Sequence, residues 1–157
     1  MDVASGLDRL RGAALQAIVE ELRATFEVER CTLRRDVAGE VFPVVHEALA
    51  AGVGSLIGDD RVDLRGQPVV QVMTSGGPQV VQPDSRAAHP SDEAFARMLE
   101  LYGGMRAQIV TPVRVGGELR AIISLHELRD ARAWTEDETR LAREAGALVG
   151  AIVGPAR

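Results

Sequence analysis

The stretch from residue 107 to residue 128 constrains the fold of this chain most strongly. It contains two apolar segments, AQIVTPVRV and ELRAIISLHEL, separated by Gly116 and Gly117. Apolar and β-branched residues favour strands, and two glycines between them suit a two-residue turn that needs positive φ. We therefore expect a hairpin of two long antiparallel strands.

A second hairpin is expected nearer the start of the chain. The segment RCTLRRDVAGEVFPVVHEAL predicts strands at about 29–36 and 41–48, with a short Asp/Gly turn between them. Pro43 favours an edge position or a bulge for the second of these strands. A shorter strand is expected at 79–84.

Amphipathic helices are expected at both ends of the chain. Apolar residues recur with helical spacing over 7–26, and Ser5 is a candidate N-cap. Near the other end, Thr135 and Glu138 form a capping box ahead of a helix that Gly154 terminates.

The segment between the two hairpins is expected to be mixed. Residues 50–66 are interpreted as loop and residues 67–74 as a short helix. A further helix is predicted to start after a cap at Ser91 and to end before Gly103 and Gly104.

These elements predict an α+β fold, with a central antiparallel sheet and amphipathic helices packed against it. The chain has 157 residues, so we expect a single domain over 1–157. No apolar run is long enough to span a bilayer, and the N-terminus lacks a signal-peptide pattern. The protein is therefore expected to be soluble and cytoplasmic, without a membrane partner.

Composition argues against several other classes of site. All 18 basic residues are arginine, the net charge is −5 and no basic cluster stands out, whereas nucleic-acid binding needs a concentrated basic face. The single cysteine, Cys31, excludes an intrachain disulfide and a multi-cysteine zinc site. Two His-Glu pairs, at His46 and His126, fix no ligand geometry, so we expect no metal.

Three segments, in this order, resemble the GAF domain, a small-molecule-binding sensor fold. They are ERCTLRRD as a first strand, RAQIVTPVRVGGELRAIISLHE as a central hairpin and RAWTEDETRLAREAGALVGAIV as a closing capped helix. The resemblance covers roughly residues 7–153. It implies that the first and last long strands are neighbours at the sheet centre and that the terminal helices cover one face. Loops and short helices of residues 50–106 would then roof a ligand pocket on the other face.

The resemblance also implies a role. A protein of this kind binds a small ligand and signals through its terminal helices to a partner chain. Such domains often dimerise through these helices, so a homodimer is expected. The output segment would lie in a separate protein or elsewhere in a longer chain.

Departures from the family pattern narrow the choice of cofactor, which is otherwise unknown. The chain has no asparagine or lysine, so it cannot match the Asn-Lys-x-x-Phe-Asp-Glu signature of cyclic-nucleotide-binding members. Bilin-binding members attach the chromophore through a cysteine later in the fold than Cys31, so no covalent bilin is expected. One cysteine cannot run the redox cycle of the methionine sulfoxide reductases of this family.

Strand alternation sorts the side chains of the predicted sheet into two faces. The last strand is expected to turn Ala121, Ile123 and Leu125 toward the helices. Its opposite side mixes apolar and polar groups, as a ligand pocket requires, and carries Ile122, Ser124 and His126.

Seven side chains are the candidate ligand-binding residues: Arg34, His46, Tyr102, Arg106, Thr111, Ser124 and His126. Arg106 is preferred as the partner of an anionic ligand, because a guanidinium bonds carboxylates and phosphates bidentately. Each of the seven also has a purely structural interpretation: a packed or solvated histidine, a surface arginine, a core tyrosine or a hydroxyl bonded within the sheet.

We therefore expect a small-molecule sensor, with an anionic ligand as one option, and not an enzyme. No Ser-His-Asp spacing, phosphate loop or paired-carboxylate pattern stands out, so no catalytic residue is assigned. Two alternatives stay open. One is a small redox or hydrolytic enzyme that uses Cys31 or the histidines, and the other is an interaction module with a vestigial pocket.

Overall fold

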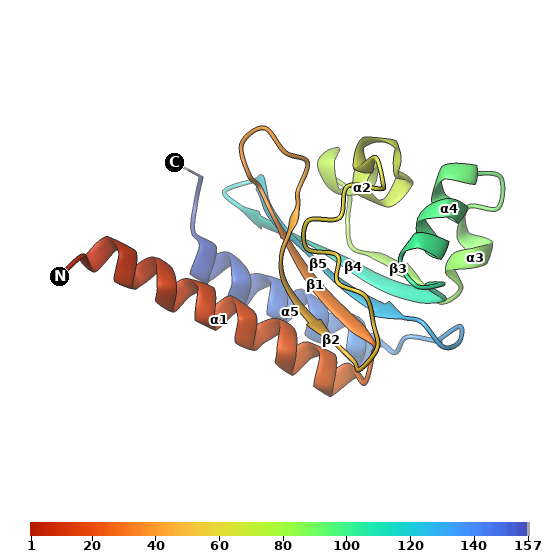
Figure 1. The fold of residues 1–157 in the computed structure, drawn as a ribbon, viewed down its shortest axis with the longest axis horizontal. Coiled ribbons are helices and arrows are strands. Elements are labelled where there is room, and N and C mark those ends of the chain that lie inside the picture. Colours follow the sequence, from red (N-terminus) through yellow and green to blue (C-terminus); the bar gives the residue numbers. More distant parts are fainter. Residues whose placement is uncertain (157) are drawn as a thin grey trace.

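The computed structural model describes residues 1–156 and shows helices on both sides of one sheet (Figure 1). In chain order the longer elements are α1 (Val3–Phe26), β1 (Arg30–Arg35), β2 (Val44–Leu49), α2 (Pro68–Thr74), α4 (Glu93–Leu101), β4 (Ala107–Val115), β5 (Glu118–Glu127) and α5 (Glu136–Val153). Three short elements complete the order: η1 (Leu64–Gly66), β3 (Val80–Gln82) and α3 (Ser85–Ala88).

The sheet has five strands in the order β2-β1-β5-β4-β3, and all neighbours are antiparallel. The expected α+β fold is therefore confirmed, including the central pairing of β1 with β5. The turn between β4 and β5 uses the two predicted glycines, with φ of 61° at Gly116 and 83° at Gly117. These angles suit glycine because it has no Cβ.

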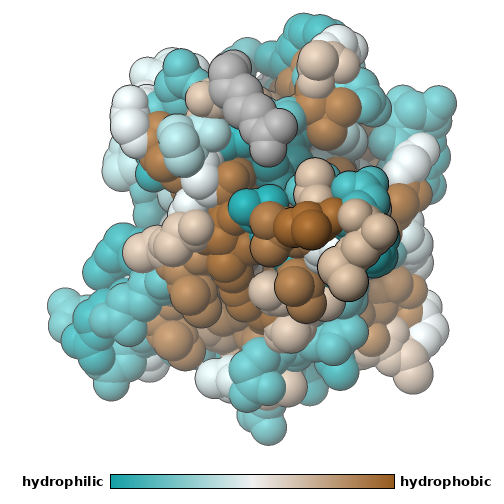
Figure 2. Space-filling view, turned by 90° about the vertical axis from the view of Figure 1, so that its left-hand side faces the viewer, coloured by the Kyte–Doolittle hydropathy of each residue, from teal (hydrophilic) through white to brown (hydrophobic). Residues whose placement is uncertain are grey.

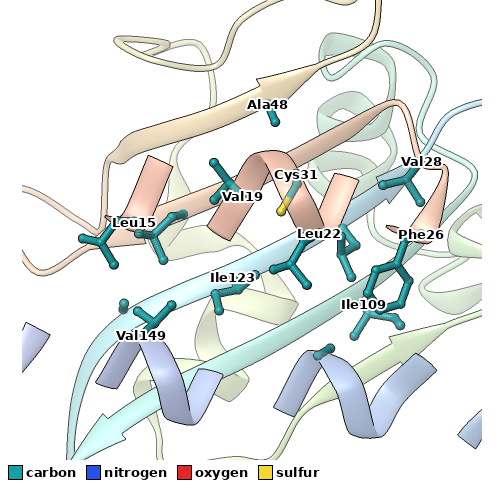
Figure 3. Close-up of a cluster of buried hydrophobic side chains, with 14 of the residues drawn as sticks. Leu15, Val19, Leu22, Phe26, Val28, Cys31, Ala48, Ile109, Ile123 and Val149 are labelled. Carbon is teal, nitrogen blue, oxygen red and sulfur yellow. The ribbon is translucent and has the colours of Figure 1, made fainter. Parts of the chain in front are cut away.

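One face of the sheet is covered by α1 and α5, which lie side by side (Figure 1). Figure 3 shows the core that they form with the strands, where side chains from α1 point toward β1 and β5. Its fully buried members include Val19, Cys31, Ile109, Ile123 and Val149. Burial of this apolar area is the main favourable term that fixes the helices on the sheet.

Two helix caps differ from the sequence prediction. The first helix begins earlier than expected, because Oδ1 of Asp2 accepts a hydrogen bond from the Ser5 backbone N–H at 3.1 Å. In α4 the N-cap is Asp92 and not Ser91, since the Asp92 carboxylate accepts from the Phe95 N–H at 2.9 Å. The capping box of Thr135 with its partner three residues later is present in α5 as predicted.

The other face is roofed by the segment that carries α2, α3 and α4 (Figure 1). A second cluster of buried apolar residues holds this roof against the sheet. From the roof it includes Met73, Phe95, Met98, Tyr102 and Met105, and from the sheet Val110 and Ile122. No helix within residues 1–156 is long and apolar enough to cross a membrane.

Arg120 connects the sheet to the end of α5. Its Nε donates to the Asp36 carboxylate at 2.7 Å, and its Nη1 donates to the Gly154 backbone oxygen at 2.6 Å. Because Arg120 is only 9% exposed, these bonds are shielded from water and hold the last turn of the helix beside the start of β5.

Candidate functional site

A small cavity lies between the roof and the sheet, with a volume of about 40 Å³. This is enough for a few water molecules. From the sheet it is lined by Arg34, Gln108, Val110, Ile122, Ser124 and His126. From the roof it is lined mainly by Gln67, Val69, Met73, Met98, Tyr102 and Met105. Apolar side chains with a few polar groups among them are typical of a ligand site.

Arg30 is 2% exposed and contacts two residues that line this cavity. Its Nη1 donates to the Tyr102 backbone oxygen at 2.8 Å and contacts Nδ1 of His126 at 3.2 Å. Its Nη2 donates to the Gly54 backbone oxygen at 3.1 Å. One guanidinium therefore connects β1, β5, the end of α4 and the loop after β2.

The contact with Arg30 fixes the tautomer of His126. A guanidinium can only donate, so Nδ1 must accept and the proton of the neutral imidazole sits on Nε2. Burial, reinforced by the charges of Arg30 and Arg34, holds the pKa of His126 well below its usual range. The ring stacks on Tyr102 with centroids 6.2 Å apart, and the residue lines the cavity as a neutral group.

Arg34 is the second cation at this site and is 8% exposed. Its Nη1 donates to the Phe42 backbone oxygen at 3.0 Å, and its Nη2 donates to the Tyr102 hydroxyl at 3.2 Å. Within residues 1–156, neither Arg30 nor Arg34 forms an ion pair with a carboxylate. The cavity therefore adjoins two buried positive charges that only neutral groups contact directly.

Four of the seven predicted site residues meet at this cavity: Arg34, Tyr102, Ser124 and His126. The alternation predicted for β5 is confirmed, because Ile122, Ser124 and His126 line the cavity while Ile123 and Leu125 belong to the core under the helices.

Thr111 does not lie at the cavity, contrary to the prediction. Its hydroxyl accepts from Nε2 of Gln79 at 2.9 Å. Its methyl group lies close to α5, because a Cβ added at Gly146 would be 3.3 Å from it. Counted back from the turn, the strand register shifts between Arg114 and Val113, so that Thr111 pairs with Ile123. A one-residue bulge moves every following side chain to the opposite face.

Arg106, the preferred anion partner, lies just outside β4 and away from the cavity. It is half-buried, and its Nη1 contacts the Arg129 backbone oxygen at 3.5 Å. The strand begins only at Ala107, so the side chain stands at the rim where the sheet meets the loop after β5. The arginine that lines the cavity is therefore Arg34, whereas the sequence prediction preferred Arg106.

His46 is on the helix side of the sheet, where its Nδ1 contacts Oε1 of Gln16 on α1 at 3.2 Å. It lies at a shallow groove between the first half of α1, the end of α5 and the edge of the sheet. Figure 2 views the side of the molecule where the termini lie and shows apolar residues gathered in the middle of that face, with hydrophilic residues around them. Because His46 lies on the helix side, the sheet separates it from the cavity.

Cys31 also faces the helices and is fully buried. Burial raises the pKa of its thiol to about 12. A thiol in this state is protonated at neutral pH and is a poor nucleophile. The described residues contain no group of three or more His, Cys, Asp or Glu side chains placed to hold a metal ion.

Sequence reasoning missed Arg30, Gln108 and the roof residues Gln67, Met73 and Met98. Alternation along β1 and β4 could have found Arg30 and Gln108, because they are two residues from Thr32 and Val110 on the same faces. The roof residues come from short helices whose placement over the sheet no local pattern indicates.

The sequence from residue 11 to residue 153 matches the model of the GAF domain family. The chain belongs to the GAF domain family. No match was found among curated protein sequences.

Solved structures of GAF domains share the architecture of this one. The blue-light-absorbing form of the Thermosynechococcus elongatus PixJ GAF domain is 20% identical, with a TM-score of 0.79 over 94% of this chain and 86% of that one. The green-light-absorbing state of NpR6012g4, a red/green cyanobacteriochrome, is 19% identical, with a TM-score of 0.73 over 89% and 91%. The far-red-absorbing dark state of JSC1_58120g3 with bound biliverdin is 18% identical, with a TM-score of 0.72 over 86% and 84%.

These structures correct the expectation about the cofactor. The position of Cys31 led us to expect no covalent bilin, yet the GAF domains that share this fold include one with bound biliverdin. The prediction of no covalent bilin was wrong because it relied on the position of a single cysteine. The fold and the side chains of the cavity also influence which class of ligand can bind.

Proposed function

We propose that this GAF domain is a sensor that binds an anionic small molecule in the cavity between the roof and the sheet. The observation that carries the proposal is the pair of buried guanidiniums, Arg30 and Arg34, which have no carboxylate partner among the described residues. Buried charges are usually paired, because removing an ion from water costs several kcal/mol, and leaving a buried charge without its partner costs about 3–5 kcal/mol.

The neighbouring His126 supports a positive local potential. The charges of Arg30 and Arg34 both lower its pKa, after the larger effect of burial. An anion would therefore be stabilised by both guanidiniums and would accept a hydrogen bond from the Nε2–H of His126 and from the hydroxyl of Ser124.

A bilin is the first candidate for this anion, because it combines carboxylates with a long apolar conjugated system and because a GAF domain of the same fold carries biliverdin. The cavity of about 40 Å³ is much smaller than the roughly 300 Å³ or more of typical ligand pockets. Binding therefore requires the roof to move outward. The unbranched side chains of Met73, Met98 and Met105 adapt to such a change more readily than branched ones.

Roof movement would make the protein a switch between two states, which a ligand biases by its difference in affinity for them. We propose that the terminal helices transmit this difference to a separate output protein, with the chain as a homodimer. Exposed leucines on both helices support an interface there: Leu7, Leu10, Leu141 and Leu148. In Figure 1 the first turns of α1 extend past the sheet. The proposal assigns no catalytic step to the chain.

The first test is native mass spectrometry and an absorption spectrum of freshly purified protein. A co-purified mass identifies the ligand, colour indicates a conjugated chromophore, and the mass of the complex gives the oligomeric state. The second test is titration with biliverdin and with its uncharged dimethyl ester, followed by absorption. We expect the diacid to bind at least about tenfold more tightly than the ester, because a hydrogen bond to a charged group contributes roughly 1.5–3 kcal/mol.

Arg34→Gln should remove most of this preference, whereas Arg65→Gln, at an exposed arginine in η1, is the matched control and should not. Equal affinity of diacid and ester in the wild type would contradict the anionic site. Absence of binding by either compound, together with no co-purified mass, would contradict the sensor proposal.

A further inference from the structure

Gln67 is a buried glutamine at the cavity whose side chain is only half satisfied. It precedes α2, is 4% exposed and lines the cavity from the roof. Its Nε2 donates to the Ala94 backbone oxygen at 3.2 Å, while its Oε1 is buried without a hydrogen-bond partner among the described residues. Buried polar atoms almost always have a partner, so this oxygen requires an explanation.

The orientation of this amide follows from chemistry. A backbone carbonyl can only accept, so the atom of Gln67 that faces Ala94 must be the nitrogen. The oxygen is then the group left free. It does not cap the helix either, because the side chain of Gln67 makes no capping hydrogen bond to α2.

The cavity carries polar groups on both sides. The sheet side supplies donors and positive charge, from Arg34, the Nε2–H of His126 and the hydroxyl of Ser124. It also carries the amide of Gln108, whose nitrogen already donates within the protein. The roof side adds Gln67, whose Oε1 is buried without a partner among the described residues. Valine and methionine side chains line the cavity between them.

We infer that the ligand of this site is a largely apolar anion that also carries an N–H donor, and that this donor bonds Oε1 of Gln67. The inference rests on the proposed anionic site and adds a second recognition point on the roof. An anion without a donor would leave the Gln67 oxygen buried and unpaired, so the site rejects it. Gln67 is thus a specificity-determining residue.

Two probes of the same shape and charge test this directly. Indole-3-carboxylate has a ring N–H, and benzofuran-3-carboxylate has a ring oxygen in its place. Calorimetry with the wild-type protein should show about tenfold tighter binding of the indole acid, because the benzofuran oxygen gives Gln67 no donor.

Gln67→Met removes the acceptor while keeping a long unbranched side chain, and should reduce the preference to less than about twofold. Gln71→Met is the matched control, because Gln71 is an exposed glutamine in α2, the helix that Gln67 precedes. It should leave the preference intact. A melting temperature measured without probe checks that both variants fold.

Each outcome decides the inference. Equal affinity of the wild type for the two acids, or a preference that survives Gln67→Met, overturns it and leaves the anionic site standing. Failure of both acids to bind also overturns it, and the biliverdin titration then decides the proposed function separately. A preference that disappears in the Gln67 variant alone supports it.

Discussion

Arg30 and His126 are in direct contact inside the protein, with Nη1 of the arginine 3.2 Å from Nδ1 of the histidine. Both residues are almost completely buried, at 2% and 4% exposure. A cation therefore lies against an imidazole that must stay neutral. We therefore expect the contact between β1 and β5 to weaken when His126 takes up a proton.

We predict that His126 makes the protein less stable in mild acid. Its folded pKa is lower than its unfolded value near 6.5, so the unfolded state takes up a proton first as the pH falls. The contribution of His126 to the free energy of unfolding is fully present above about pH 6.5 and is lost as the pH falls toward the folded pKa. Urea unfolding of wild type and His126→Gln between about pH 5 and 8 measures this. Identical slopes in the two proteins would show that His126 does not titrate in this way.

Glu127 is predicted to have the opposite effect. Burial, and then the hydrogen bond and the charge of Glu29, raise the pKa of Glu127 from 4.5 to about 7. Its contribution to the free energy of unfolding is present below about pH 4.5 and is lost as the pH rises through about 7. Glu127→Gln keeps a neutral group at this position. It should therefore raise the stability at pH 8 by on the order of 1 kcal/mol, with solvent screening allowed for.

Chemical denaturation at pH 8 and at pH 5 gives the comparison for Glu127. The gain should be small at the lower pH, where the wild-type carboxyl already holds its proton. Asp130→Asn, at an exposed carboxylate in the next loop, is the control and should change little. A gain of the same size at both pH values would point to packing and not to ionisation.

Cys31 is predicted to be inert in the native protein. It is fully buried, and its thiol pKa of about 12 leaves almost no thiolate at neutral pH. A thiol reagent should react only as fast as the protein unfolds, and should titrate one thiol per chain in denaturant. Rapid modification of the folded protein would revive the interpretation as a small redox or hydrolytic enzyme.

Gly77→Ala is predicted to destabilise the roof. A Cβ at Gly77 would lie 2.7 Å from the Val72 backbone oxygen and 2.5 Å from its Cγ1, so the end of α2 must shift. We expect a loss of about 1–3 kcal/mol in the free energy of unfolding. Gly66→Ala, where nothing lies within 4 Å of the added Cβ and φ is not positive, is the control and should stay within about 0.5 kcal/mol.

The sequence predicted the sheet and its terminal helices well because the signals involved are local. The turn at Gly116 and Gly117, the capping box at Thr135 and the alternation around Ser124 each depend on a few consecutive residues. Composition and alternation were enough to assign the α+β fold and the cavity face of β5.

The errors at the site came from features that consecutive residues do not encode. A two-residue turn followed by regular pairing would place Thr111 opposite Ile122, on the cavity side. The shift after Val113 instead pairs Thr111 with Ile123 and turns its side chain to the helices. Arg106 was preferred because it is close to the roof in sequence, whereas the structure places Arg34, and not Arg106, at the cavity.

The Arg120 contacts place the end of α5 at the far end of a strand that also lines the cavity. Arg120 and His126 lie on the same strand, six residues apart in the sequence, which corresponds to roughly 20 Å along an extended chain. The first residue bonds the carbonyl that ends α5, and the second lines the cavity. One continuous strand therefore joins the cavity to the end of the C-terminal helix.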